Sequence, residues 1–119
     1  MDIESFRNYC IQKKGVTEEL PFGPDNLVFK VMGKMFSIAS LDEVPLRVNL
    51  KCDPERAIEL REEYEENILP GYHMNKQHWN TLVLDGRLDP KLVLELINHS
   101  YELVVKSLPK KLQKELENL

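Results

Sequence analysis

The sequence predicts a two-layer α+β domain in which helices cover one face of a single antiparallel sheet of about five strands. Apolar residues recur at helical spacing near both ends of the chain, and with the strand period of two between residues 27 and 51. Turn signals join the expected strands into hairpins, and no strand–helix–strand repeat of a parallel fold is present. The expected order is α-β-β-β-α-β-β-α, and the 119 residues suit a single domain, residues 1–119.

The first helix is expected over residues 2–14, where Asp2 can cap the N-terminus. One stripe at helical spacing holds Ile3, Phe6 and Cys10. The following stretch, VTEELPFGPDN (residues 16–26), is expected to be a connection, because its prolines and glycine exclude regular structure.

Two strands of a hairpin are expected between residues 27 and 39, with Gly33 at the tight turn. A third strand follows at residues 45–51, and its two faces differ in character. One face holds Leu46, Val48 and Leu50, and the other holds Arg47, Asn49 and Lys51. This alternation predicts that one face of the sheet is buried under the helices and that the other meets solvent.

The second half of the chain alternates helix and strand signals. A second helix begins at Asp53, a capping residue followed by a proline at the first helical position. After a Pro-Gly break, residues 72–84 are expected to form two short strands around a turn. A third helix begins at Asp89 with the same cap and proline, and stops before Pro109. Residues 110–119 have the pattern of one more short amphipathic helix.

The net charge of −4 comes from one segment of the chain. Residues 51–67 hold seven acidic and three basic residues, and the remaining residues hold 13 of each kind. The simplest interpretation of this acidic run is the solvated outer face of the second helix. Such a chain is not a polycation of the kind that coats phosphate backbones, although it leaves room for a modest basic patch elsewhere.

No apolar run approaches the ~20 residues of a membrane span, and the acidic, amphipathic N-terminus differs from a secretory signal. The two cysteines, Cys10 and Cys52, form no C-x-x-C motif. They are predicted to be reduced thiols that fill space near the core. We therefore expect a cytoplasmic protein that does not enter a membrane.

The stretch PGYHMNKQHWNT, residues 70–81, holds two of the three histidines and the only tryptophan. His73 and His78 are five residues apart, which places them on opposite faces of one continuous strand, and no cysteine lies near them in sequence. No metal site is therefore predicted. The aromatic pair Tyr72 and Trp79 has two interpretations: both pack the sheet, or at least one stands on its uncovered face.

Motifs of common enzyme classes are missing from the sequence. A phosphate-binding loop around Gly33 and Lys34 would need glycine at Val28 and serine or threonine at Met35. No spacing suggests a nucleophile beside a base. We predict no catalytic residue, no enzymatic activity and no cofactor.

Four runs of sequence carry a resemblance to a known family: PFGPDNLVFKVMGKMF, KCDPERAIELR, PGYHMNKQHWNTLVLDG and LINHSYELVVKSLPKK. From about Phe6 to Lys111 the chain resembles the YjbR/MmcQ-like family of small bacterial proteins. The resemblance implies a single α+β domain with an antiparallel sheet, similar to secretion chaperones and CyaY-like proteins. The family is often labelled DNA-binding because its fold is similar to a "double wing" arrangement, and the resemblance implies no catalytic residue.

Two functions that use the same exposed sheet face follow from these observations. The first is DNA binding through two β-turn wings, near Gly33 and Asn75, with basic residues on phosphates and an aromatic residue stacked on a base. The second is a protein-interaction module that holds a protein partner or forms a homodimer. The negative net charge counts against DNA, because each phosphate contact needs a cation. For either function, the predicted contact residues are Lys30, Lys34, Arg47, Lys51, His73, Asn75, Lys76, His78 and Trp79.

Overall fold

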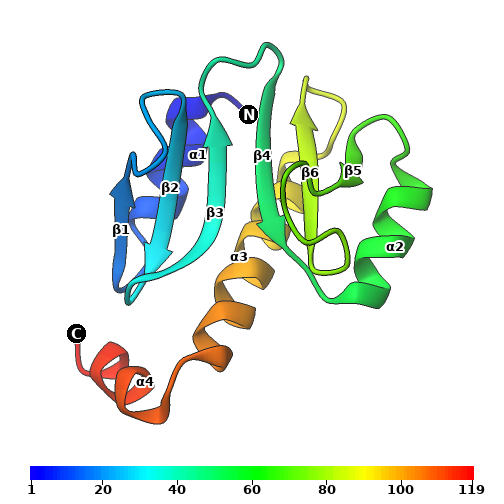
Figure 1. Ribbon diagram of the computed structural model, residues 1–119. Helices are drawn as coiled ribbons and strands as arrows, with labels where there is room; N and C mark the ends of the chain where they lie inside the picture. Colours follow the sequence, from blue (N-terminus) through cyan, green and yellow to red (C-terminus); the bar gives the residue numbers. More distant parts are fainter.

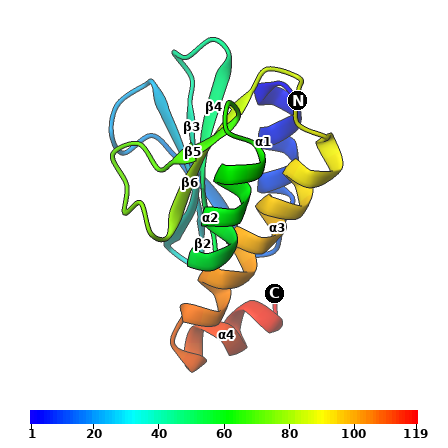
Figure 2. The ribbon, with the colours of Figure 1, turned by 90° about the vertical axis from the view of Figure 1, so that its right-hand side faces the viewer.

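The computed structural model describes residues 1–119 and consists of four helices and six strands (Figure 1). In chain order the elements are α1 (Ile3–Ile11), β1 (Val16–Glu19), β2 (Asn26–Val31), β3 (Lys34–Ser40), β4 (Leu46–Lys51), α2 (Pro54–Glu63), β5 (Ile68–Pro70), β6 (Trp79–Leu84), α3 (Pro90–Ser107) and α4 (Lys110–Glu117). The strands form one antiparallel sheet in the order β1-β2-β3-β4-β6-β5. Helices α1, α2 and α3 lie on one face of this sheet (Figure 2). The predicted two-layer α+β architecture is confirmed, with six strands rather than five.

The two edge strands are the parts of the sheet that the sequence prediction placed wrongly. The connection expected over residues 16–26 is wrong for its first four residues, which pair with β2 as strand β1. The prolines of that stretch lie after the strand ends. The strand expected from residue 72 lies earlier, at Ile68–Pro70. A proline is compatible with β5 because an edge strand pairs along one side only.

Helix caps follow the sequence closely. Each predicted cap accepts a hydrogen bond from a backbone N–H of the first turn: Asp2 from Ser5 (2.8 Å), Asp53 from Glu55 (3.1 Å) and Asp89 from Lys91 (2.9 Å). These caps are confirmed, although α1 ends at Ile11, before the predicted residue 14. The expected C-terminal helix is present as α4. None of the four helices combines the length and apolar character that a membrane crossing demands.

The hairpin between β2 and β3 turns at Met32 and Gly33, whose φ angles are 50° and 85°. Two consecutive left-handed residues make the tight turn whose twist suits paired strands. The pairing also shifts register within this hairpin, because Phe29 lies opposite Ser37 and Lys30 lies opposite Met35. Phe36 is therefore an extra residue, a β-bulge.

The hydrophobic core lies between the sheet and the helices. Val48 and Leu50 of β4 are buried in it, and Leu46 packs against it. Arg47 and Asn49 lie on the other face, where they line a cleft. The register predicted for this strand from its alternating residues is therefore confirmed.

Both cysteines are buried, and neither forms a disulfide. Burial raises the pKa of the Cys10 thiol to about 12 and that of the Cys52 thiol to about 11. Both thiols are thus protonated at neutral pH, and they serve as small apolar residues in the core.

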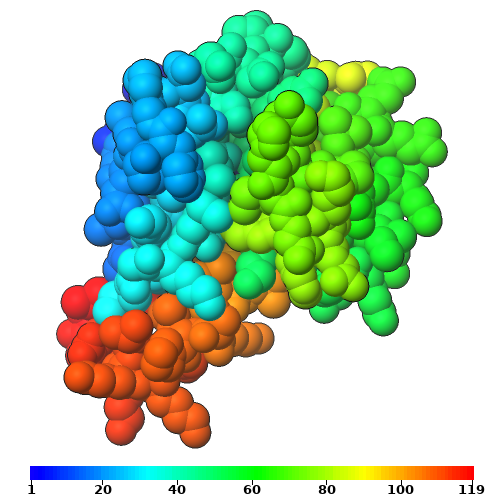
Figure 3. Space-filling model, viewed as in Figure 1, coloured from blue at the N-terminus to red at the C-terminus, as the bar shows by residue number.

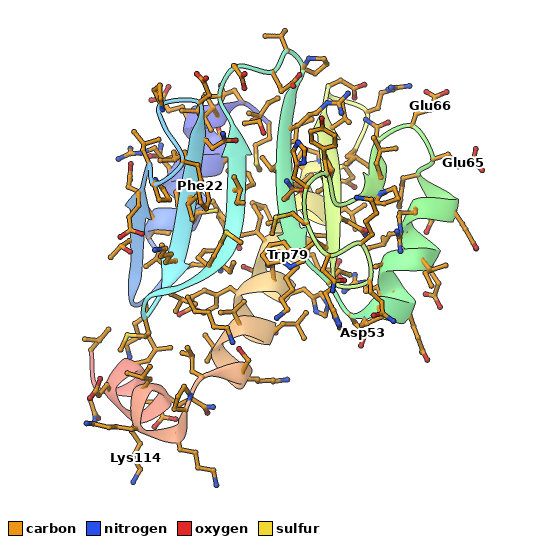
Figure 4. The ribbon with its side chains drawn as sticks, viewed as in Figure 1. Phe22, Asp53, Glu65, Glu66, Trp79 and Lys114 are labelled. Carbon is orange, nitrogen blue, oxygen red and sulfur yellow. The ribbon has the colours of Figure 1, made fainter.

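The acidic residues of the segment 51–67 lie on and after α2. Figure 4 places Asp53 at the start of that helix and Glu65 and Glu66 beyond its end, at the side of the molecule away from α4. Most of these carboxylates are exposed to solvent. Glu66 contacts Arg87 at the surface, an exposed ion pair of the kind that contributes little to stability.

His99 on α3 connects two helices and makes stability depend on pH. Its Nε2 accepts a hydrogen bond from the backbone N–H of Asp53 (3.1 Å), the residue that caps α2. Only a neutral imidazole nitrogen can accept this bond. Burial and, to a smaller extent, the charge of Arg56 lower the pKa of His99 below its ordinary value of 6.5, outweighing the nearby carboxylates.

We therefore expect the free energy of unfolding to decrease as the pH falls through about 6.5, because the unfolded chain then binds a proton on this imidazole more readily than the folded chain. Well above that pH the imidazole is neutral in both states and the effect vanishes. Denaturant unfolding of the wild type and of His99→Gln, between about pH 5.5 and pH 8, measures it. The variant keeps a hydrogen-bond acceptor but cannot be protonated, so its free energy of unfolding should change less with pH. If the free energy of unfolding depends on pH equally in both proteins, His99 is not the group responsible.

Candidate functional site

The sheet face opposite the helices is bordered by two loops, residues 20–25 between β1 and β2 and residues 71–78 between β5 and β6. Between them lies a cleft of about 730 Å³, which is within the size range of ligand-binding sites. Figure 3 shows a hollow between the blue and the yellow-green segments of the surface, where this cleft lies. Strands β2, β3, β4 and β6 supply its floor, and the two loops, together with the loop between β3 and β4, supply its walls.

Cross-strand pairing arranges the floor in two rows. The first row, on β2, β3 and β4, consists of Asn26, Ser40 and Arg47. The second row, on β3, β4 and β6, consists of Ile38, Asn49 and Thr81. Side chains directly opposite in antiparallel strands lie about 5 Å apart, so each row forms a continuous strip. All members except Ile38 are polar.

A hydrogen-bond relay fixes the orientation of Asn49. The backbone N–H of Tyr72 donates to Thr81 Oγ1 (3.0 Å), and the Thr81 hydroxyl donates to Asn49 Oδ1 (2.5 Å). Because the hydroxyl already accepts from Tyr72, its own proton needs an acceptor, and the amide oxygen of Asn49 supplies it. The Nδ2 group of Asn49 is left as a free donor in the cleft.

Backbone contacts hold the loop 71–78 against the sheet. The N–H of Gly71 donates to the carbonyl of Trp79 (2.9 Å), and Lys76 Nζ donates to the carbonyl of Gly71 (3.1 Å). Asn75 Oδ1 accepts from the N–H groups of Gln77 (2.9 Å) and His78 (3.3 Å). The loop is therefore an ordered turn structure that closes on itself.

Two exposed aromatic side chains stand in the walls of the cleft. Phe22, from the first loop, is 68% exposed, and Tyr72, from the second, is 66% exposed. Figure 4 places Phe22 over β2 and β3. The Tyr72 ring packs against the His73 ring with centroids 4.0 Å apart, and His73 takes a left-handed conformation (φ 60°). Phe22 and Tyr72 come from opposite ends of the strand order, so they flank the floor from two sides.

Arg47 is the one arginine of the five whose side chain has no acceptor. The others donate to a carboxylate or a carbonyl: Arg7 to Glu18, Arg56 to Glu95, Arg61 to Ala57 and Arg87 to Asp85 and Glu66. Asp42 and Glu43 also line the cleft, yet neither carboxylate lies within the 4.0 Å of an ion pair to Arg47. The guanidinium is therefore available to a ligand.

Of the predicted contact residues, Arg47 and His73 line the cleft. Trp79 is only 8% exposed, and its backbone carbonyl accepts a hydrogen bond from the N–H of Gly71 in the loop 71–78. It therefore packs the sheet and offers no stacking surface. Asn75 and His78 act within the loop through the contacts described above.

The predicted lysines do not gather at one place. Lys30 forms an ion pair with Glu19 on the neighbouring strand (2.6 Å), and Lys76 is held on its own loop. Lys34 Nζ donates to Ser107 Oγ (2.8 Å) at the end of α3, so it points toward the helical layer. Lys51 makes no side-chain contact of this kind. The turns near Gly33 and Asn75, which were predicted to act as wings, therefore present their lysines in different directions.

Several cleft residues were not among the sequence predictions. The most prominent is Phe22, and the polar floor residues are Asn26, Ser40, Asn49 and Thr81. The period-two pattern places Asn49 on the open face, but it does not reveal that a cleft forms there. No three histidine, cysteine, aspartate or glutamate side chains come together in a way that could hold a metal ion.

Comparison with known proteins gives consistent relatives. The family model that matches, over residues 11–103, is that of YjbR. YbdF of Escherichia coli O157:H7 is 44% identical over 95 residues, which covers 79% of this chain and 76% of YbdF. YjbR of Escherichia coli K12 is 32% identical over 119 residues and covers both chains completely.

Two solved structures are similar to this fold. A crystal structure from Deinococcus radiodurans has a TM-score of 0.90 at 41% identity and covers 97% of this chain and 87% of its own. A crystal structure from Pseudomonas syringae has a TM-score of 0.73 at 28% identity and covers 87% of this chain and 98% of its own. The names of these relatives state no activity, so function has to be argued from the cleft.

Proposed function

The chain belongs to the YjbR family, and we propose that it is a protein-interaction module that binds a segment of a partner protein in the cleft. The observation that carries the proposal is the pair of exposed aromatic side chains, Phe22 and Tyr72, on either side of a polar floor with an unpaired arginine. Aromatic residues and arginine are enriched at protein interfaces, and lysine is depleted there. As proposed, the module catalyses no reaction and needs no cofactor.

The charge of the cleft supports a protein partner over nucleic acid on this face. Its charged lining consists of one guanidinium, Arg47, and two carboxylates, Asp42 and Glu43. A phosphate backbone requires a surplus of cations along its path, and the charged lining of the cleft has no such surplus. A polypeptide segment with mixed side chains can satisfy both signs of charge.

A selection experiment tests the proposal directly. The wild-type domain is used to select from a displayed library of random twelve-residue peptides, and the enriched peptides are then synthesised and titrated. We expect the double variant Phe22→Ala/Tyr72→Ala to bind these peptides at least ~10-fold more weakly, because aromatic anchors dominate such interfaces. The matched control is Ile58→Ala, an exposed apolar residue of α2 (51% exposed), which should bind as the wild type does.

Failure to enrich any peptide, or equal binding by the double variant, would overturn the proposal. A second copy of this chain is the alternative occupant of the cleft. In that case sedimentation of the wild type would show a dimer that the double variant loses, and the selected peptides would compete with dimerisation.

Nucleic acid remains a second candidate because of a different surface. Lysines gather at the end of the molecule formed by α3 and α4: Lys34, Lys106, Lys110, Lys111 and Lys114. Figure 4 shows Lys114 at that end, away from the acidic residues that follow α2.

Titration of a labelled DNA duplex at low and moderate salt separates the candidates. Binding that weakens in Lys110→Gln/Lys111→Gln, with a salt slope shallower by about one unit per lost contact, would favour DNA; the absence of binding at low salt would remove it.

A further inference from the structure

Two side chains in the floor of the cleft, those of Arg47 and Asn49, have hydrogen-bond donors without a partner in the chain. The guanidinium of Arg47 has five N–H donors, none of which meets an acceptor within the chain. Asn49 adds its Nδ2 group, because its Oδ1 is already bound by Thr81. Asn49 lines the cleft and is only 9% exposed, so a ligand in the cleft is the partner open to this donor. A floor of this kind suits a group that only accepts hydrogen bonds.

These two donors are placed to act on one group. Arg47 and Asn49 are two residues apart on β4, so their side chains leave the same face about 7 Å apart at their origins. The long arginine side chain spans such a distance, and Ser40 lies directly opposite Arg47 on β3. An ionised carboxylate accepts through two oxygens and matches the planar fork of arginine.

The rim of the cleft restricts which anion can enter. Asp42 and Glu43, on the loop between β3 and β4, are exposed and line the same cleft. They repel a ligand with several negative charges, as a chain of phosphates has, and they attract a basic group. One carboxylate seated on Arg47, with uncharged or basic neighbours, satisfies both features.

We infer that the partner segment presents a carboxylate to the cleft, beside an apolar or aromatic residue, and that Arg47 is the residue that selects it. This inference rests on the proposed function and names the chemistry of the partner. Arg47 and Asn49 Nδ2 bind the carboxylate oxygens, and Phe22 and Tyr72 pack on the neighbouring apolar side chain. The carboxylate belongs to an aspartate, a glutamate or a free C-terminus of the partner.

The experiment is a double-mutant cycle that combines a substitution of Arg47 with a substitution of the acidic residue of the peptide. From the enriched twelve-residue peptides, one is synthesised with its acidic residue and again with the matching amide, and both are titrated against the wild type and Arg47→Gln. For the wild type we expect the amide peptide to bind about 10- to 100-fold more weakly, as for the loss of a charged hydrogen-bond partner. For Arg47→Gln the two peptides should bind equally. A C-terminal carboxamide peptide tests the free C-terminus in the same way.

Controls separate this inference from the proposed function. Arg47→Lys keeps the charge without the fork and should recover only part of the preference, and Arg7→Gln, on α1, should behave as the wild type. Thermal unfolding confirms that each variant is folded. Enriched peptides without acidic residues, or an acid preference that persists in Arg47→Gln, would overturn the role of Arg47 while the peptide-binding function stands. The absence of any enriched peptide would overturn both.

Discussion

Replacing Gly71 with alanine is expected to destabilise the domain by about 2–4 kcal/mol, because the added methyl group has no room. An alanine Cβ at this position would lie 2.8 Å from Trp79 Cβ, 2.9 Å from the Trp79 carbonyl oxygen and 3.1 Å from Met74 Cβ. Two of these atoms are Cβ atoms fixed to the chain and one belongs to the backbone itself. The loop 71–78 must therefore move away from β6.

The displacement also reaches the cleft. The N–H of Gly71 donates to the Trp79 carbonyl, and the next residue, Tyr72, carries both the exposed ring and the start of the relay to Asn49. We therefore expect Gly71→Ala to lose peptide binding together with stability. Denaturant unfolding and the peptide titration described above measure the two effects.

Gly33→Ala is the matched control. Gly33 has a left-handed φ of 85°, yet nothing lies within 4 Å of the position of an added Cβ. The substitution should lower the free energy of unfolding only by the cost of backbone strain, about 1–2 kcal/mol, and should leave peptide binding unchanged. A loss of stability in Gly71→Ala no larger than that in Gly33→Ala would show that the loop adapts to the methyl group.

The features that sequence predicts correctly are those that local chemistry determines. Aspartate followed by proline places the starts of α2 and α3, since the cap and the fixed φ of proline act within one turn. Alternation along β4 gives the correct register, because a shift by one residue would bury Arg47. These signals need no knowledge of the rest of the chain.

The edge strands illustrate what local signals miss. Val16–Glu19 is short, half exposed and ends in two glutamates, so its two β-branched residues are too short a signal to predict a strand. It becomes one because β2 offers a free edge beside the end of α1. Ile68–Pro70 is similar, since its pairing with β6 depends on a long loop that returns the chain.

The cleft itself depends on tertiary structure. Phe22 and Tyr72 are 50 residues apart in sequence, and they come together only because the strand order places their loops at the two sides of the open face. The bulge at Phe36 likewise alters the alternation of β3, and Lys34 at its start points toward Ser107 instead of the open face. The alternation of β6 places Trp79 on the same face as Thr81, but its side chain is only 8% exposed in the folded protein.

Ser100→Ala is expected to destabilise the domain by about 2–4 kcal/mol, because one hydroxyl serves two buried backbone groups. Strands β3 and β4 part beyond the pair Ser37 and Leu50, and Ser100 of α3 lies at this junction. Its Oγ donates to the carbonyl of Phe36 (2.6 Å) and accepts from the N–H of Lys51 (2.9 Å). Alanine preserves the shape of the site and leaves both backbone groups without a partner.

The chain offers a closely matched control in Ser37. Ser37 and Ser100 are both fully buried (0% exposed), but the Ser37 hydroxyl has no hydrogen-bond partner. Ser37→Ala removes an unpaired polar group from the core, so we expect it to be neutral or slightly stabilising. Urea unfolding of both variants, with unchanged dependence on denaturant concentration, makes the comparison. If both alanine variants shift the midpoint equally, burial rather than hydrogen bonding decides the cost, and the junction role of Ser100 is wrong.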